Sequence, residues 1–385
     1  MLHVLFLSVW YPHRYDAMAG LFVRKHALAV SRYARVTVLY LHEDDRISKI
    51  EIIDLTTESV REIYVYYPKS HFPHISYRRA FKRGWKYVTE HCGKPDITHV
   101  SVLGKQAVSA YRLWRRYGIP YVITEHWTGY TENNFKYKGW LRKRMTELVV
   151  RNAKCIMPVS KHLADRMKFL GLKGNYCVVR NVVDDFFYTP YDKKTQSDGK
   201  IRLLHVSCFD DDAKNVTGLL KAIADLRKRR NDFMLTLVGT GQDFDMCKDC
   251  ARQLQIEDTC LFTGELTPEQ VAEQMFCHDV FVMFSNFENA PVVISEALAV
   301  GIPTVSSNVG GIPEMITATE GILVAPRDVE ALTNALDTMC DTYMQYDKDK
   351  IRRQGELYSF EKVGKEIFEK YNRYCGIRSV DFPTD

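Results

Sequence analysis

Two successive series of short apolar runs, each alternating with amphipathic stretches, constrain the fold of this chain more than any other feature. Most of the intervening stretches carry apolar residues three and four positions apart, with charged residues on the opposite face. Strands that alternate with helices are typical of a parallel sheet covered by helices on both faces. The first series predicts strands at residues 3–9, 35–41, 63–67, 97–102, 121–124, 155–159 and 176–179, and helices at 21–33, 78–92, 105–117, 138–152 and 162–170.

A polar segment at residues 188–199 separates the two series and has the composition of an exposed linker. The predicted fold class is therefore α/β, with two Rossmann-like, doubly wound domains, residues 1–190 and 200–360, that face a central cleft. A last helical pattern, within residues 361–385, is expected to pack back on the first domain. Ligands of such sheets bind beyond the carboxyl ends of the strands, so two substrates are expected to meet in the cleft. The second series predicts strands at residues 201–207, 234–238, 260–262, 280–284, 304–306 and 322–324.

Composition and hydropathy exclude several protein classes. With 46% hydrophobic and 26% charged residues and no low-complexity tract, the chain is neither disordered nor fibrous. The apolar residues 1–10 lack a basic leader and a small-residue cleavage site, and they predict a buried strand instead of a signal peptide. No apolar run approaches the ~18 residues that span a bilayer, so we expect a cytoplasmic protein. Cys247 and Cys250 lack the second pair that a structural zinc site needs, so we expect reduced thiols and no metal.

Charge is divided unevenly between the two halves. Residues 1–190 carry 31 Lys or Arg against 16 Asp or Glu, whereas residues 191–385 carry 22 against 32. A basic half favours an anionic partner, such as phospholipid headgroups, a phosphorylated acceptor or nucleic acid, and a solvated surface is the alternative. Residues 77–87 and 136–144 mix cations with Trp and Tyr, as helices on anionic membranes do. We therefore expect peripheral contact with the inner face of an anionic membrane and, since no nucleic-acid motif is present, no binding to nucleic acid.

The most informative segment is one where a strand ends, a loop carries Glu288, and a helix is predicted to begin near Pro291. The unpaired amides of a helix's first turn, with the positive end of the helix dipole, form a site for phosphate. Glu296 falls on the second turn, where a carboxylate can accept hydrogen bonds from a ribose diol. Taken alone, the two glutamates are better explained as a dipole-stabilised carboxylate and a solvated helix face.

The loop after the next strand carries Gly310 and Gly311, which allow a close backbone approach, and then Pro313 and Glu314, which open a short helix. From Glu288 to Glu314 the sequence resembles the C-terminal signature of the retaining glycosyltransferases called group 1 or family 4. That signature is an acidic residue, seven intervening residues, Glu-Ala, an Ala-x-Gly-x-Pro turn and a Gly-Gly-x-x-Glu loop. The resemblance implies the GT-B fold, with an acceptor-binding first domain and a nucleotide-sugar-binding second domain. It extends in order to residues 181–184, 238–241, 262–264 and 321–324.

The resemblance also implies roles for single residues. Glu288 would bind hydroxyls of the donor sugar, Glu296 the ribose, and Lys214 the diphosphate as its bond to the sugar breaks. His126 would lie near the transferred sugar, although a buried, satisfied histidine is nearly as compatible with the sequence. The implied catalytic residues are His126, Lys214 and Glu288, the implied acceptor-binding residues are Gly20 and His126, and the implied donor-binding residues are Gly20, Gly239, Glu288, Asn289, Ala290, Pro291, Val292, Val293, Glu296, Gly310 and Gly311.

One departure from the family pattern concerns the phosphate site. Many relatives carry an arginine a few residues before the lysine, whereas this chain has Ser207, Cys208 and Phe209 there. The diphosphate would lose one cation, so either another residue supplies it or the phosphates depend more on Lys214 and the helix amides.

The resemblance thus implies a retaining transferase that moves a hexose from a UDP- or GDP-linked donor to a saccharide acceptor. We expect a lipid-linked acceptor, a role in surface polysaccharide or glycan synthesis, and no metal or other cofactor. Two alternatives stay open: a non-catalytic partner subunit of the same fold, and a nucleotide-sugar epimerase or phosphorylase on that fold. A nicotinamide dehydrogenase is disfavoured because no complete Gly-x-Gly-x-x-Gly follows the first strand of either half. The sugar, the base, the acceptor and the oligomeric state do not follow from the sequence.

Overall fold

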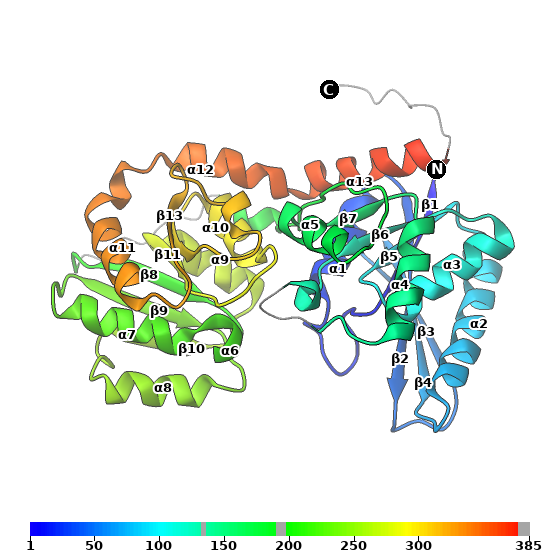
Figure 1. Cartoon of the computed structure of the whole chain (residues 1–385), viewed down its shortest axis with the longest axis horizontal. Coiled ribbons are helices and arrows are strands. Elements are labelled where there is room, and N and C mark those ends of the chain that lie inside the picture. Colours follow the sequence, from blue (N-terminus) through cyan, green and yellow to red (C-terminus); the bar gives the residue numbers. More distant parts are fainter. Residues whose placement is uncertain (132–135, 190–197, 376–385) are drawn as a thin grey trace.

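The computed structural model describes residues 1–131, 136–189 and 198–375, and shows two α/β domains side by side (Figure 1). Each domain contains one sheet between helices, and a separate apolar core lies on each face of each sheet. The predicted fold class is confirmed. The linker predicted at residues 188–199 lies mostly outside the described residues.

The N-terminal sheet has the strand order β3-β4-β2-β1-β5-β6-β7, and every pairing is parallel except that of β3 with β4. Without β3, the order reverses direction beside β1, as in nucleotide-binding doubly wound sheets, which places a crevice at the carboxyl ends of β1 and β5. The strands are β1 (His3–Ser8), β2 (Arg35–Asp44), β3 (Glu51–Thr57), β4 (Val60–Pro68), β5 (Ile97–Ser101), β6 (Tyr121–Glu125) and β7 (Ile156–Pro158). The helices are α1 (Leu21–Ser31), α2 (Pro73–His91), α3 (Lys105–Tyr117), α4 (Trp140–Asn152) and α5 (Lys161–Phe169).

Two details of this sheet differ from the sequence-based prediction. Strand β3 was not predicted, because it is a half-exposed edge strand whose sequence mixes charged, polar and apolar residues without a clear period. A strand predicted at residues 176–179 is absent: the segment hydrogen-bonds along β7, but only Tyr176 forms an isolated bridge, to Ile156. Its apolar residues pack into the core beside the sheet, but the segment does not add a strand to the sheet.

The C-terminal sheet has the order β10-β9-β8-β11-β12-β13 and is entirely parallel. Its order reverses beside β8, so the crevice lies between the loops that follow β8 and β11. The strands are β8 (Ile201–Val206), β9 (Phe233–Val238), β10 (Cys260–Gly264), β11 (Val280–Met283), β12 (Thr304–Ser307) and β13 (Gly321–Val324). The helices are α6 (Asp211–Lys214), α7 (Val216–Arg227), α8 (Phe244–Gln253), α9 (Pro268–Cys277), α10 (Val292–Val300), α11 (Val329–Thr342) and α12 (Lys348–Gly355).

The last described helix, α13 (Phe360–Cys375), leaves the C-terminal domain and lies on the N-terminal one (Figure 1). Its apolar face belongs to the same core as α1, and a side chain at Gly364 would lie 2.2 Å from the Ala29 carbonyl oxygen. At the start of this crossing, the Val183 amide donates to the Tyr358 carbonyl at 2.9 Å. The segment that leaves the N-terminal domain and the segment that returns to it therefore run side by side. Among the helices of the described part of the chain, none contains an apolar stretch of the length that a bilayer requires.

Candidate active site

The loop after β11 and helix α10 lie at the crevice of the C-terminal sheet, as the sequence predicts. Pro291 is the N-cap of α10, and the amides of Val292 and Val293 in the first turn have no carbonyl partner within the helix. Glu288 and Asn289, which precede the helix, are both buried. This arrangement offers backbone donors and the positive end of a helix dipole to an anion.

Lys214 lies opposite this loop and forms an ion pair with Glu288, with 2.5 Å between Nζ and Oε1. Two hydrogen bonds hold the loop after β11 against α6: the Asn286 amide donates to the Ala213 carbonyl, and the Asn286 side chain donates to the Asp212 carbonyl, each at 2.8 Å. Burial opposes the positive charge on Lys214, but Glu288 more than offsets this effect and raises the pKa of Lys214. Two of the three implied catalytic groups, Lys214 and Glu288, are therefore together, and the lysine is charged.

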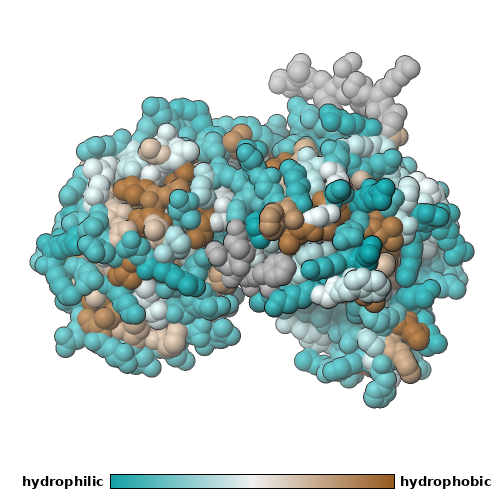
Figure 2. Space-filling view, in the orientation of Figure 1, coloured by the Kyte–Doolittle hydropathy of each residue, from teal (hydrophilic) through white to brown (hydrophobic). Residues whose placement is uncertain are grey.

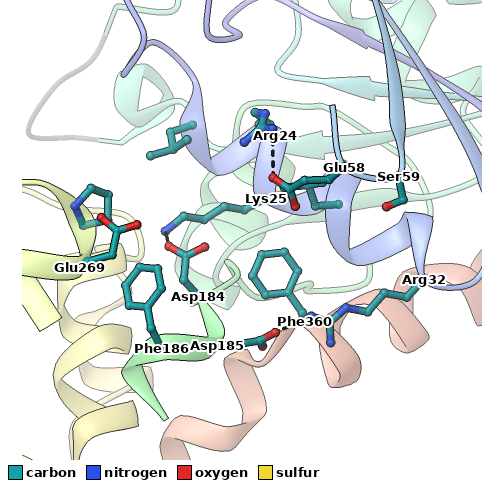
Figure 3. A pocket seen from close by; sticks show the side chains of 13 residues that line it. Arg24, Lys25, Arg32, Glu58, Ser59, Asp184, Asp185, Phe186, Glu269 and Phe360 are labelled. Carbon is teal, nitrogen blue, oxygen red and sulfur yellow. Dashed lines mark hydrogen bonds and ion pairs between the residues drawn. The ribbon is translucent and has the colours of Figure 1, made fainter. Parts of the chain in front are cut away.

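Glu296 lies on the buried face of α10 and has a partner that the sequence did not suggest. The Lys25 ammonium, on α1 of the other domain, lies 3.7 Å from Glu296 Oε1 and 2.7 Å from Asp184 Oδ2. Burial, with a smaller effect of Asp184, raises the pKa of Glu296 above its usual value, and Lys25 only partly opposes this shift. Figure 3 shows Lys25 extending from α1 toward Asp184.

A cavity of about 390 Å³ lies between the two domains beside Glu296. The C-terminal domain contributes Gly239, Val292, Val293 and Glu296, all of which the sequence predicted as donor-binding, and the loop that carries Cys208. The N-terminal domain contributes apolar residues and Lys25 from the start of α1. More of the wall comes from the ends of β8 and β9 and the residues just after them, from the segment that follows β10, and from α9. These residues are Val206, Ser207, Val238, Thr240, Glu265, Leu266, Pro268 and Val271.

The glycines of the predicted site make their close approaches to other parts of the chain. A side chain at Gly310 would lie 1.7 Å from the Glu288 carbonyl oxygen, and one at Gly311 would lie 2.2 Å from that of Asn289. Gly239 meets Ser207 in the same way, at 1.9 Å. Gly310 and Gly239 also have positive φ angles, of 56° and 123°. These glycines therefore shape the loops at the crevice by letting their backbones touch.

Gly20 is the N-cap of α1 and has a φ angle of 63°. A side chain there would lie 2.4 Å from the carbonyl group of Trp10. Gly20 thus folds the loop after β1 back on itself, and its neighbours Met18 and Leu21, not Gly20, line the cavity.

His126 follows β6 and lies against Phe22, with 4.4 Å between ring centroids. Burial, together with the nearby His26 and His99, lowers the pKa of His126 well below its usual value, so the imidazole is neutral. Its Nε2 is buried without a hydrogen-bond partner among the described residues. The side chain of Asn181 opposes this lowering of the pKa of His126.

Three polar contacts join the loops of the two domains around this site. Asn289 Nδ2 donates to the His126 carbonyl at 2.7 Å, and Asn181 Nδ2 donates to the Ala290 carbonyl at 2.8 Å. The carboxylate of Glu314 accepts from the amides of Lys161 and His162, both at 2.7 Å, and so caps α5 from the opposite domain. The structure therefore brings the predicted donor-binding loop into direct contact with the loop that carries His126.

Three residues of this region were missed by the sequence analysis. Lys25 is a cation on the buried side of an amphipathic helix, where only its partners in the fold explain it. Glu125 ends β6 and accepts from the amides of Leu103, His126 and Trp127. Glu314 was predicted only to open a short helix, whereas it is the last residue of the 3₁₀ helix Ile312–Glu314. A charged residue directly after an apolar strand was the only signal that pointed to Glu125.

No three His, Cys, Asp or Glu side chains gather within the described residues into a group that could hold a metal ion. Cys247 and Cys250 both lie on α8 as free thiols.

Two family models match successive parts of this chain. Residues 26–185 match Glycosyltransferase Family 4, and residues 189–355 match Glycosyl transferases group 1. Together the matches cover most of the chain.

Among curated relatives, the chain is similar to a glycogen synthase of Mycobacterium tuberculosis, with 28% identity over 68% of this chain and 64% of the relative. It is also similar to N-acetyl-alpha-D-glucosaminyl L-malate synthase of Bacillus anthracis, with 30% identity over 57% and 58%. The chain thus matches somewhat less than two thirds of the length of either relative.

Solved structures share the fold along nearly the whole chain. Sucrose-phosphate synthase from Thermosynechococcus elongatus superimposes with a TM-score of 0.78 at 18% identity, over 98% of this chain and all of that chain. HepE from Anabaena, in complex with UDP-glucose, gives a TM-score of 0.73 at 16% identity, over 97% of this chain and all of that chain. These likenesses establish the architecture of two facing Rossmann-like domains, known as GT-B. With the family matches over both halves, they show that the chain belongs to the group 1, family 4 glycosyltransferases.

Proposed function

We propose that this chain transfers a hexosyl group, with retention of the anomeric configuration, from a UDP- or GDP-sugar to a saccharide acceptor. The observation that carries the proposal is the position of the Glu288–Lys214 ion pair, which lies directly before the open first turn of α10 at the crevice of the C-terminal sheet. The cavity beside this turn reaches Glu296 and has walls from both domains. Its size suits a nucleotide.

Each group then has a role that its surroundings support. The first-turn amides of α10 bind the diphosphate, Glu296 accepts from the ribose hydroxyls, and Glu288 binds hydroxyls of the donor sugar. Lys214, kept charged by Glu288, stabilises the negative charge that grows on the diphosphate as its bond to the sugar breaks. His126 faces the same interdomain contact as a neutral imidazole, suited to a hydroxyl of the sugar or the acceptor.

Retention is expected to need no protein nucleophile. The acceptor hydroxyl attacks the face from which the diphosphate leaves, and a diphosphate oxygen takes the acceptor's proton. The protein contributes positioning and charge stabilisation in a cleft that excludes water, which limits hydrolysis of the donor.

Binding of a nucleotide tests this donor site. Thermal unfolding would be measured with UDP, GDP and a panel of their sugars, for the native chain and for Glu296→Ala. A rise in the midpoint for one nucleotide, lost in the variant, supports the site and identifies the base. No rise with any of these ligands favours the non-catalytic partner subunit. Incubation with the stabilising sugar nucleotide and saccharide acceptors then separates transfer from epimerisation, because only transfer yields a new glycoside.

The surface of the N-terminal domain supports a lipid-linked acceptor at the inner face of an anionic membrane. Helices α2, α3 and α4 carry five, four and four Lys or Arg and together only two Glu. A groove of about 680 Å³ between α2 and α3 is lined by six of these cations, three aromatic rings and no carboxylate. The lining cations are Arg78, Arg79, Lys82, Lys86, Arg112 and Arg116, and the rings are those of Phe81, Trp85 and Tyr117. Cations that alternate with aromatic rings suit an anionic lipid surface.

Exposed apolar side chains lie at the beginnings of two of these helices: Phe72 and Ile75 at α2, and Trp140 and Leu141 at α4. Figure 2 shows hydrophobic groups within the mostly hydrophilic surface of this domain. In an α/β domain, the helices begin at the edge where the parallel strands end. These apolar groups therefore lie toward the edge that faces the cleft, where an acceptor held in a membrane would enter.

Co-sedimentation with vesicles tests the membrane contact. Phosphatidylglycerol-containing vesicles should bind the native chain, whereas vesicles of phosphatidylcholine alone should not. Replacement of Arg79 and Lys82 by Glu should release it, and replacement of Lys221 and Lys228, on and just after α7 of the other domain, should not. Equal binding of both double variants would contradict this assignment of the surface.

A further inference from the structure

Lys25 is a buried cation that the proposed reaction does not use. Its side chain is only 8% exposed, although a lysine ammonium is strongly hydrated and costly to bury without partners. Both partners are carboxylates from outside its own helix, Asp184 at 2.7 Å and Glu296 at 3.7 Å. Of these, Glu296 is the residue to which we assign the ribose. A buried lysine that reaches this carboxylate needs an explanation in terms of the donor.

Lys25 lines two cavities at once. One is the donor cavity of about 390 Å³, and the other, of about 430 Å³, is shown in Figure 3 and lies at the junction of the two domains. In the second cavity, the other cations on or next to α1 have their own partners: Arg24 of α1 pairs with Glu58 and Glu62, and Arg32, the C-cap of α1, pairs with Asp185. Lys25 is therefore the cation of α1 that reaches the donor cavity.

Removal of the Lys25 charge would raise the pKa of Glu296 further. Burial already disfavours the negative charge of Glu296, and Asp184 adds a second carboxylate nearby, so both raise its pKa. Lys25 is the group that opposes these two effects. A protonated Glu296 would keep one carbonyl oxygen as a good acceptor, whereas the carboxylate offers two oxygens to the two hydroxyls of a ribose.

We propose that Lys25 is a positioning residue for recognition of the ribose: its ammonium holds the Glu296 carboxylate as a two-oxygen acceptor for the diol. Because Lys25 belongs to α1 and Glu296 to α10, the ribose site is complete only when the two domains are closed on each other. Recognition of the nucleotide and closure of the cleft are then one event. This inference rests on the proposed function, since it assumes that a nucleotide occupies the donor cavity.

Discrimination between ribose and its dideoxy form tests Lys25 directly. Isothermal titration of the intact chain would compare UDP with 2′,3′-dideoxy-UDP, and GDP with 2′,3′-dideoxy-GDP. The native chain should prefer one ribonucleotide over its dideoxy form by about tenfold or more, because charge-assisted hydrogen bonds are lost. Lys25→Met, which keeps the length of the side chain without its charge, should reduce this ratio to about threefold or less. A merely structural role would weaken both ligands alike and leave the ratio unchanged.

Two further variants keep the result interpretable. Arg32→Met removes an ion pair between the C-cap of α1 and Asp185, the neighbour of Asp184, without touching Glu296, and should keep the native ratio. Asp184→Asn removes the other carboxylate that pairs with Lys25 and leaves the pair with Glu296, so this variant should also keep the native ratio. It can be measured even if Lys25→Met fails to fold. A native ratio in a folded Lys25→Met, or a lost ratio in Asp184→Asn, would overturn the inference while the proposed donor site stands. Failure of the native chain to bind either ribonucleotide would overturn both.

Discussion

Lys214 Nζ lies 2.5 Å from Glu288 Oε1, although 74 positions separate the two residues in the chain. Each follows one of the two strands, β8 and β11, that are neighbours where the order of the C-terminal sheet reverses. The topology of the sheet therefore brings a cation and a carboxylate from distant loops to one place, beside the first turn of α10.

Loss of either member of this pair should abolish most of the transfer. We expect Lys214→Ala and Glu288→Ala each to lower kcat by about 10²–10³-fold, because a charge aimed at the leaving group or a contact with the sugar is lost. The two losses should not add, since each variant leaves the other group without its partner. The measurement is steady-state transfer with the donor identified by thermal unfolding.

Stability and a matched lysine provide the controls for these variants. Lys221→Ala removes an exposed lysine of α7 and should leave kcat within about twofold of the native value, as surface substitutions do. Circular dichroism should show a native fold for all three variants. Near-native rates in both Lys214→Ala and Glu288→Ala would sink the assignment of the catalytic site.

Gly310→Ala should destabilise the C-terminal domain and displace the loop that carries Glu288. The new side chain would lie 1.7 Å from the Glu288 carbonyl oxygen, in a backbone with a φ angle of 56°. We expect a loss of about 3 kcal/mol or more in the free energy of unfolding, from strain and steric overlap together.

Gly264→Ala is the matched comparison for Gly310→Ala. Its φ angle of 78° is also positive, but nothing lies within 4 Å of the added methyl group. The expected cost is therefore about 1 kcal/mol, from the left-handed backbone alone. Calorimetric unfolding of both variants measures the difference, and equal losses would contradict the close contact between the two loops.

Much of the architecture could be predicted from the sequence because it depends on local patterns. Strands buried on both faces appear as continuous apolar runs, as in β1 and β11, and helices between them appear by their 3.6-residue period. The edge strand β3 is the exception, since it carries no such pattern and is defined by its pairing with β4. Contacts between residues far apart in the chain could therefore not be predicted from local sequence patterns.

The same contrast between local sequence patterns and distant contacts holds for the candidate site. The resemblance to the family implied roles for Glu288, Glu296 and Lys214, because each lies in a segment that matches the family pattern. The partner of Glu296 was not predicted, since Lys25 lies on another domain, and nothing in a helix sequence shows which cation will be buried against a distant carboxylate. The glycines were predicted as ligand contacts. In the structure the close approaches of Gly239, Gly310 and Gly311 are to Ser207, Glu288 and Asn289, and Gly239 also lines the donor cavity.

Glu314→Ala should favour the open arrangement of the domains. The native carboxylate caps α5 from the opposite domain, while Ser160 Oγ accepts from the third amide of the helix, that of Leu163. Loss of a carboxylate at a helix N-terminus costs about 1 kcal/mol. Since only the closed form completes the cleft, the apparent affinity for the nucleotide should fall by about threefold to tenfold.

Small-angle scattering measures this change as a larger radius of gyration without ligand. Glu330→Ala removes an exposed carboxylate at the N-terminus of α11 in the same domain, and should alter neither quantity. An unchanged radius and affinity in Glu314→Ala would show that its contact with α5 does not contribute to closure.

Glu125 should make the stability of the N-terminal domain depend on pH. Burial raises the pKa of this carboxyl from 4.5 to about 7, although three backbone amides oppose the shift. A carboxyl whose pKa is higher in the folded than in the unfolded state stabilises the fold fully below pH 4.5, and this stabilisation is lost as the pH rises through about 7. Over that range the native chain should lose up to about 3 kcal/mol relative to Glu125→Gln, which cannot ionise.

All five tryptophans lie in the N-terminal domain, so urea unfolding followed by tryptophan fluorescence reports on this domain alone. A difference between the two proteins that stays constant from pH 4.5 to 7 would mean that Glu125 is already ionised at the lower pH, held by its three amide donors.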